Sequence, residues 1–190
     1  MSLQPRQPPL WSAGEFLDAE VDGNQRHEFV NGAVFAMAGG SAEHGIITLN
    51  IASAVNSGAP ETCQVFASDM KVRFRTETDE RCYYPDVVVS CSAAEPDRYF
   101  RTEPVLLVEV FSPTTERTDR LEKLPIYKSI ASVTEIALIA QANRTVELYR
   151  RRTGWAPELY GEKDRVTFES VGVAVDVSQI YRRIPPRSPW

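Results

Sequence analysis

The feature that most constrains the fold of this chain is the run from Val105 to Phe111, which is apolar except for Glu109. A strand this apolar must be covered on both faces, which predicts a central place in a sheet with helices packed against it. The run from Tyr83 to Ser90 has the same character and predicts a second central strand. A charged glutamate there loses hydration worth several kcal/mol unless it is paired, protonated or bound to a cation. The fold must therefore bring a partner to Glu109.

A second carboxylate, that of Asp86, follows Pro85 and opens the apolar run Val87 to Val89. The simplest explanation of two such carboxylates is that they meet, since adjacent strands lie about 4.8 Å apart. At that spacing both could share one divalent ion. For Glu109 alone, a buried salt bridge or a position at a frayed strand end are the alternatives.

The segment after this strand supplies two more charged side chains. A helix is predicted over about 119–130, and Asp119 and Lys123 lie four residues apart, on one face of it. Taken alone, the two form an ordinary surface ion pair. Pro125 complicates the helix, because proline removes a hydrogen bond and clashes with the preceding turn. The helix either begins near Glu122 or bends at Pro125, and both choices affect where Lys123 points.

Turn and capping signals predict the remaining elements. Ser12 followed by Glu15 is the capping pattern of a short helix, and Asn31-Gly32 is a strong hairpin signal. A longer helix is predicted from Ser41 to Asn56 by its helical spacing of apolar residues. Further strands are predicted at 27–30, 33–38, 64–66, 70–74, 135–140, 145–150, 155–160 and 166–168. The predicted fold class is α+β, with a mixed central sheet flanked by two main helices, an N-terminal hairpin and a C-terminal hairpin.

Length and composition fit one globular domain. A chain of 190 residues, 43% of them hydrophobic, is long enough for one core. We expect a flexible arm at 1–11, a single domain at 12–182 and a proline-rich tail at 183–190. No apolar run is long enough to cross a bilayer, and the polar start lacks the pattern of a signal peptide, so the cytoplasm is the expected location.

Cysteine use and net charge narrow the function further. Cys63, Cys82 and Cys91 have no C-x-x-C spacing, and each is expected to be a reduced, half-buried side chain. The net charge of −5 argues against a general nucleic-acid coat protein, because nonspecific affinity comes from neutralising phosphates. It does not argue against a nuclease, since carboxylates that hold a metal are part of the acidic count.

The set of Asp86, Glu109 and Lys123 suits phosphodiester hydrolysis. That reaction needs an activated water and neutralisation of the charge that develops on phosphorus. A Mg²⁺ or Mn²⁺ ion held by Asp86 and Glu109 would lower the pKa of a bound water and bind a phosphate oxygen. A nearby lysine would orient the water or stabilise the developing charge.

The order of these residues resembles that of the Uma-two-type restriction endonucleases of the PD-(D/E)xK superfamily. The resemblance rests on an ordered series that spans roughly residues 12–182: His27 to Gly32, Ser41 and His44, Tyr84-Pro85-Asp86, Glu109 to Pro113, Asp119, Lys123, Tyr127, and Thr145 to Tyr149. It implies a restriction-endonuclease-like core in which Asp86 and Glu109 are metal ligands.

One departure from the superfamily pattern moves the lysine. Phe111 occupies the place two residues after Glu109 where the superfamily usually has lysine, so the resemblance assigns that role to Lys123. It also places Glu28, His44 and Asp119 at the edge of the site. A solvated strand residue is the alternative for Glu28, and a structural histidine is the alternative for His44.

The partner implied by the resemblance is DNA. Lys71, Arg73 and Arg75 share one face of a predicted strand and are candidates for phosphate contact, with a solubilising surface as the alternative. Pairing as a homodimer would let such a domain cut both strands. Two other functions stay open: an inactive module of the same fold that binds nucleic acid or protein, and a metal-dependent hydrolase of another substrate.

Overall fold

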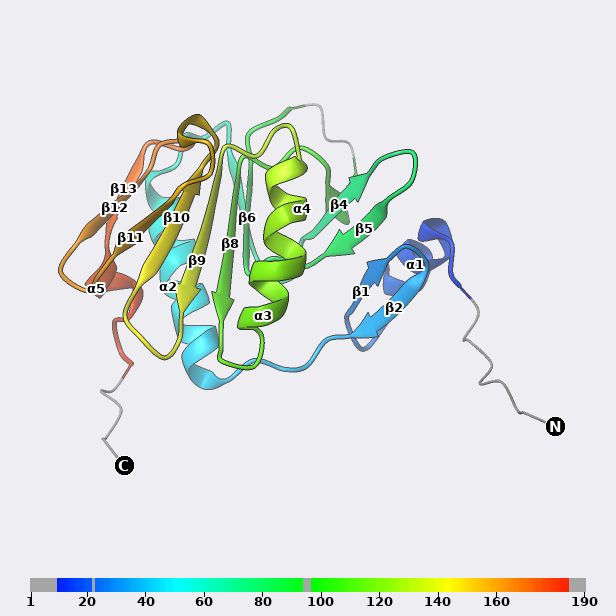
Figure 1. The fold of residues 1–190 in the computed structure, drawn as a ribbon, viewed down its shortest axis with the longest axis horizontal. Helices are drawn as coiled ribbons and strands as arrows, with labels where there is room; N and C mark the ends of the chain where they lie inside the picture. The colour runs from blue at the N-terminus through cyan, green and yellow to red at the C-terminus, as the bar shows by residue number, and fades with distance from the viewer. Residues whose placement is uncertain (1–9, 22, 94–96, 185–190) are drawn as a thin grey trace.

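The structure is a computed structural model that describes residues 10–21, 23–93 and 97–184 (Figure 1). Most of the expected arm at 1–11 and of the tail at 183–190 lies outside these residues. Among the described residues, no helix has both the length and the apolar character needed to span a membrane. The helical segments are α1 (Ala13–Val21), α2 (Ala42–Gly58), α3 (Glu116–Thr118), a π-helical segment (Asp119–Lys123), α4 (Leu124–Ser129), a 3-10 turn (Arg151–Thr153) and α5 (Val177–Ile180).

The described strands form three sheets, where one mixed sheet was expected. The six-stranded sheet has the order β11-β10-β9-β8-β6-β3, the five-stranded sheet the order β2-β1-β5-β4-β7, and β12 pairs with β13. The strands of the six-stranded sheet are β3 (Gln64–Ala67), β6 (Val87–Ser90), β8 (Leu106–Phe111), β9 (Glu135–Ala140), β10 (Val146–Arg150) and β11 (Pro157–Tyr160). The other strands are β1 (His27–Val30), β2 (Ala33–Ala36), β4 (Lys71–Arg75), β5 (Glu80–Tyr83), β7 (Phe100–Arg101), β12 (Arg165–Phe168) and β13 (Val173–Asp176).

The six-stranded sheet is covered by helices on its two faces (Figure 1). β8 lies in its interior, antiparallel to β6 and parallel to β9. Alternate residues of β8 point to opposite faces. Val108 and its alternate neighbours pack with α2, whereas Leu107 and Phe111 pack with Tyr127 of α4. Glu109 shares the second face, which directs its carboxylate toward α4.

The N-terminal cap and hairpin form as predicted. The hydroxyl of Ser12 accepts from the backbone N–H of Glu15, whose carboxylate in turn accepts from the backbone N–H of Ser12. Asn31 and Gly32 join β1 to β2 with φ of 49° and 92°. Both positive angles are those of the tight turn that favours Asn-Gly. In the β1–β2 pair, Glu28 lies directly opposite Phe35.

The predicted single strand from Tyr83 to Ser90 is wrong. β5 ends at Tyr83 in one sheet and β6 begins at Val87 in another. Pro85 lies between them and has no N–H to donate to a ladder, so the chain leaves the first sheet there. Asp86 therefore stands at the crossing from one sheet to the other, directly before β6.

The helix that carries Lys123 begins earlier than predicted and contains a wider turn. It starts at Glu116, and its middle, Asp119–Lys123, is π-helical, with Leu124 N–H donating to the carbonyl of Asp119. Pro125 lies two residues after the end of this segment, as the second residue of α4. In a regular helix its ring would meet the carbonyl four residues back, and a π turn is one way to accommodate it.

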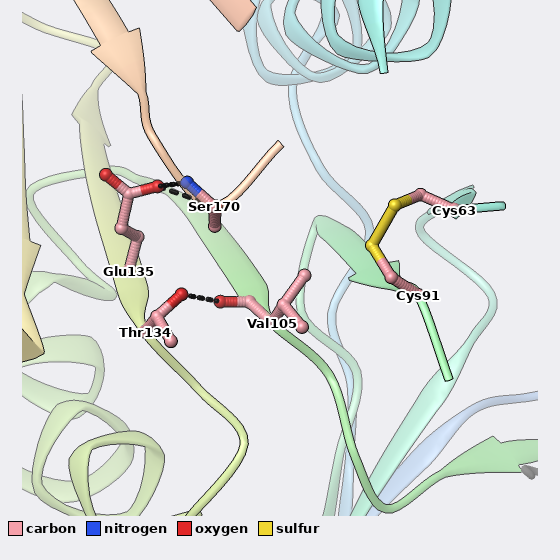
Figure 2. Close-up of a disulfide and its surroundings, with 6 residues drawn as sticks. All are labelled: Cys63, Cys91, Val105, Thr134, Glu135 and Ser170. Atoms are coloured by element: carbon pink, nitrogen blue, oxygen red, sulfur yellow. Dashed lines mark hydrogen bonds between the residues drawn. A yellow bond between two sulfur atoms is a disulfide. The ribbon is translucent and has the colours of Figure 1, made fainter. Parts of the chain in front are cut away.

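The expectation of three reduced cysteines is wrong for two of them. Cys63 and Cys91 form a disulfide (Figure 2). Cys82 is the free, buried cysteine among the described residues. The pairing follows from the sheet, because β3 and β6 are antiparallel with Gln64 opposite Ser90. One step further along this register places the two cysteines opposite each other. A separation of 28 residues in sequence hides that register.

Candidate active site

A pocket of about 530 Å³ opens between the β1–β2 hairpin, the start of α2 and the helix that begins at Glu116. Its lining brings together residues that lie far apart in sequence. The acidic and basic side chains predicted for the site all line it: Glu28, His44, Asp86, Glu109, Asp119 and Lys123. The structure thus gathers both the predicted centre and the predicted edge of the site in one cavity.

Lys123 stands at the centre of a carboxylate cluster. Its Nζ lies 2.8 Å from Glu28 Oε1, 3.4 Å from Glu109 Oε1 and 3.6 Å from Asp119 Oδ1. The Lys123 side chain comes from the π-helical segment, Glu28 from β1 and Glu109 from β8. The interpretation of Asp119 and Lys123 as a surface ion pair is wrong, because both are buried.

Burial and charge shift the titration of this cluster in opposing ways. Glu109 is only 3% exposed, and burial raises its pKa well above the ordinary value even though the Lys123 charge lowers it. Burial likewise raises the pKa of Asp119. For Lys123, burial lowers the pKa, but the carboxylates of Glu109, Glu28 and Asp119 outweigh it and the net shift is upward. The pocket lining therefore contains four carboxyl groups, those of Glu28, Asp86, Glu109 and Asp119, but only one lysine ammonium.

Tyr127 holds the Glu109 carboxylate from the helix side. Its hydroxyl, fully buried, donates to Glu109 Oε1 at 2.7 Å. Tyr127 lies on α4 one turn after Lys123, so one helix supplies both polar contacts to the same oxygen. The resemblance included Tyr127, but the sequence offered no separate reason to place its hydroxyl on a carboxylate.

Replacing Tyr127 by phenylalanine is expected to lower the free energy of unfolding by about 1.5–3 kcal/mol, the usual range for a hydrogen bond to a charged group. Urea unfolding measures the effect. Tyr149→Phe is the matched control, because its hydroxyl also donates to a glutamate, Glu147, which Arg120 continues to hold. A loss for Tyr127→Phe no larger than that of the control would contradict the argument.

Asp86 is held on both of its oxygens. Oδ1 accepts from His44 Nε2 at 2.8 Å, and Oδ2 accepts from the backbone N–H of Val110 at 2.6 Å. The second bond joins the crossing segment to β8, in line with the register that pairs Val87 with Val108. One step further along the register places Asp86 opposite Glu109, and the Asp86 charge contributes to the raised pKa of Glu109.

Gln141 fixes the other side of the His44 ring, and no pattern in the sequence indicates this role. Its amide nitrogen lies 3.2 Å from His44 Nδ1 and 3.5 Å from the Val110 carbonyl, and its amide oxygen accepts from Ser41. A carbonyl only accepts, so the amide atom facing Val110 is the donor. His44 Nδ1 then accepts a hydrogen bond, and the protonated Nε2 donates one to Asp86. The hydrogen bond to Asp86 also raises the pKa of His44.

The two histidines of this chain are expected to hold opposite neutral tautomers. His44 should carry its proton on Nε2, whereas His27, whose Nδ1 lies 2.8 Å from a Glu20 carboxylate oxygen, should carry it on Nδ1. Long-range nitrogen–proton NMR of histidine-labelled protein at mildly alkaline pH distinguishes them. Gln141→Glu, which offers only acceptors, should draw a proton to His44 Nδ1 and leave His27 unchanged. A proton on Nδ1 of His44 in the wild type would contradict this assignment.

The basic strand face lies away from the pocket. Lys71 is only 4% exposed and its ammonium donates to the Tyr84 hydroxyl at 3.2 Å, while Arg73 is paired with Glu80. Arg75 is exposed at the end of β4. None of the three lines the pocket that holds the carboxylates. Their contact with phosphate stays a prediction, and it would concern another part of the surface.

The donor set suits a hard divalent cation. Among the described residues, no group of three or more Asp, Glu, His or Cys side chains is arranged to hold a metal by itself. Asp86 and Glu109 can supply two carboxylates, and Mg²⁺ commonly binds one or two of these together with waters and substrate phosphate oxygens. The excess of carboxyl groups over ammonium groups in the lining and the burial of Glu109 favour a cation at this place.

Comparison with known proteins places the sequence in a family. The sequence matches the Uma2 family, described as "Putative restriction endonuclease", over residues 13–178. Protein slr1290 of Synechocystis sp. is 30% identical over 178 residues, covering 92% of this chain and 93% of that protein. Protein sll1609 of Synechocystis sp. is 31% identical over 168 residues, covering 84% and 93%.

A solved structure has the same fold. The crystal structure of a protein from Anabaena variabilis, described as "a putative nuclease belonging to DUF820", matches with a TM-score of 0.68 and covers 87% of this chain and 96% of that chain. At 18% identity this likeness establishes the fold alone, and it confirms the predicted α+β class with mixed sheets flanked by helices. With the family match along most of the sequence, the chain belongs to the Uma2 family.

Proposed function

We propose that this protein is a metal-dependent endonuclease that hydrolyses phosphodiester bonds of DNA. The observation that carries the proposal is the pocket that Asp86, placed just before β6, shares with Glu109 of the neighbouring strand β8, whose carboxylate faces the buried ammonium of Lys123. Charged groups this deeply buried cost stability, so their presence points to a function other than folding. Carboxylates with perturbed pKa values in a pocket are typical of active sites. The family match supports the reaction class.

Asp86 and Glu109 would hold Mg²⁺ or Mn²⁺. When bound, such an ion lowers the pKa of a water and withdraws charge from a phosphate oxygen. His44 and the Val110 N–H orient Asp86, and Tyr127 orients Glu109, so both carboxylates are fixed before substrate arrives. This kind of support from surrounding groups is what gives metal ligands their geometry.

Lys123 would act on the phosphate. Its ammonium stays charged, since its pKa is raised, and it can stabilise the negative charge that develops as water attacks phosphorus. Glu28 and Asp119 hold the ammonium close to the Glu109 carboxylate and so limit the positions that it can reach. Two copies of the chain, each acting on one strand, would form the working homodimer, and light scattering of the purified protein tests that state.

Plasmid cleavage tests the function. Wild-type protein should nick or linearise supercoiled DNA in Mg²⁺ or Mn²⁺ and leave it intact in EDTA. Asp86→Ala and Glu109→Ala should be inactive, while Glu147→Ala, which removes a carboxylate outside the pocket, should keep the activity. Cleavage that persists unchanged in both pocket variants would refute the proposed site. Tight DNA binding without cleavage in any ion would instead favour the binding-module function.

A further inference from the structure

Phe35 gives the pocket an exposed aromatic wall that the hydrolytic groups do not explain. Its side chain is 55% exposed, yet it lines the pocket together with the segment that follows it. That segment, Ala36–Gly40, has no charged side chain and no side-chain hydrogen-bonding group. It runs from β2 past the ends of α3 and β8 toward α2 (Figure 1). This part of the pocket lining is therefore apolar.

The sheet register places this ring beside the ion cluster. Phe35 on β2 is directly opposite Glu28 on β1, so the two side chains stand on the same face of the sheet. The Glu28 carboxylate contacts the Lys123 ammonium, which in turn faces Glu109. A group stacked on Phe35 would thus lie next to Glu28, which is linked to Glu109 through the Lys123 ammonium.

A second part of the pocket lining, from the end of β8 to the helix that follows it, carries four hydroxyl side chains. They belong to Ser112, Thr114, Thr115 and Thr118. Hydroxyl groups of this kind donate to phosphate and sugar oxygens in nucleic-acid complexes. Lys123 is the one basic lysine or arginine among the lining residues, and three carboxylates already surround it. The pocket therefore lacks the several free cations with which a protein grips the phosphates on both strands of a duplex.

From these features we propose that the pocket binds an unpaired nucleotide, with its base stacked on Phe35 and its phosphate directed toward Asp86 and Glu109. The proposal rests on the proposed function and names its substrate class: single-stranded DNA or a nucleotide turned out of a duplex. A base inside a duplex has both faces covered by its neighbours, so it cannot meet Phe35 without leaving the stack. Aromatic stacking accepts any base, because every base has a π-face.

Binding of labelled oligonucleotides tests the stacking. Fluorescence anisotropy would compare a single-stranded DNA of about 15 nucleotides, a duplex of the same length and an abasic strand, in EDTA and in Ca²⁺. The wild type should bind the single strand most tightly. Phe35→Ala should weaken that binding roughly five- to a hundredfold, the range that stacking of one base supplies. Phe35→Tyr, which keeps the ring face, should bind like the wild type.

Two controls separate stacking from loss of apolar surface. Leu159→Ala removes an apolar side chain that is 70% exposed on β11, outside the pocket, and should leave binding unchanged. On the abasic strand, Phe35→Ala and wild type should bind equally, because the base that contacts the ring is absent. Equal thermal unfolding of Phe35→Ala and wild type would show that the edge strand is intact.

The outcomes distinguish this proposal from the proposed function. A duplex bound as tightly as the single strand, a single strand bound equally by Phe35→Ala, or no binding of either probe in both buffers would overturn the stacking proposal. Stacking as expected, combined with no cleavage of any DNA, would refute the nuclease function and leave the base-binding pocket standing. Duplex cleavage that Phe35→Ala leaves unchanged would refute the stacking proposal and leave the nuclease function standing.

Discussion

Replacing Glu109 by glutamine is expected to reduce DNA cleavage by roughly three orders of magnitude or more while leaving the fold at least as stable as the wild type. The loss of activity follows because an amide is a poor ligand for Mg²⁺ and carries no charge. The stability is expected because burial raises the pKa of Glu109, which means that its charged form is a cost to the native state. Tyr127 can still donate to the amide oxygen.

Single-turnover cleavage and urea unfolding of the same preparation measure the two effects. Glu135→Gln is a matched control, because Glu135 is also a buried glutamate in a central strand but lies outside the pocket, paired with Arg150. Glu135→Gln should be less stable than the wild type, and its cleavage activity per folded molecule should be unchanged. The prediction fails if Glu109→Gln unfolds markedly more easily than wild type, or if it cuts DNA at a comparable rate.

Replacing Lys123 by methionine is expected to cost about 3–5 kcal/mol of unfolding free energy at neutral pH, together with the loss of cleavage. Lys123 is only 7% exposed, so solvent cannot screen the carboxylates that it leaves behind. Removing the ammonium raises the pKa of Glu109 and of Asp119 further, since its charge lowers both.

The raised pKa values of Glu109 and Asp119 predict how the stability loss of Lys123→Met changes with pH. A carboxyl group whose folded-state pKa is raised stabilises the native state while it is protonated and loses that contribution as pH rises through the raised pKa. The penalty of Lys123→Met should therefore shrink as pH falls below neutral. Denaturant unfolding across pH measures it, and Lys123→Met with Glu109→Gln should recover part of the loss if the single variant folds poorly. A penalty that stays constant with pH would contradict the cluster of buried carboxylates.

The centre of the site could be predicted because its residues are anomalies in the sequence. Glu109 in an apolar strand and Asp86 at the head of another break the hydrophobic pattern, and the structure places both in one pocket. Gln141 breaks no pattern, since glutamine in a turn is ordinary. Its contact with His44 depends on two elements 97 residues apart, which composition and local spacing do not connect.

The elements of the fold were predictable where local rules decide them. The cap at Ser12 and the turn at Asn31-Gly32 depend on neighbouring residues only, and both formed as expected. The division into sheets depends on Pro85, whose effect on the ladder shows only once its pairing partners are known. The disulfide between Cys63 and Cys91 depends on the β3–β6 register in the same way.

The π turn before Pro125 makes the site sensitive to the length of the helix rather than only to its residues. Such a turn holds one residue more than an α-helical turn, so deleting one residue from it would restore regular winding. Leu121, whose side chain is largely exposed, could be deleted with little loss of core packing. The deletion would rotate the preceding turn by about 100° relative to Tyr127. Asp119 and Tyr127 would then no longer face the same cluster. The rotation of one half of this helix relative to the other therefore determines which side chains meet in the site.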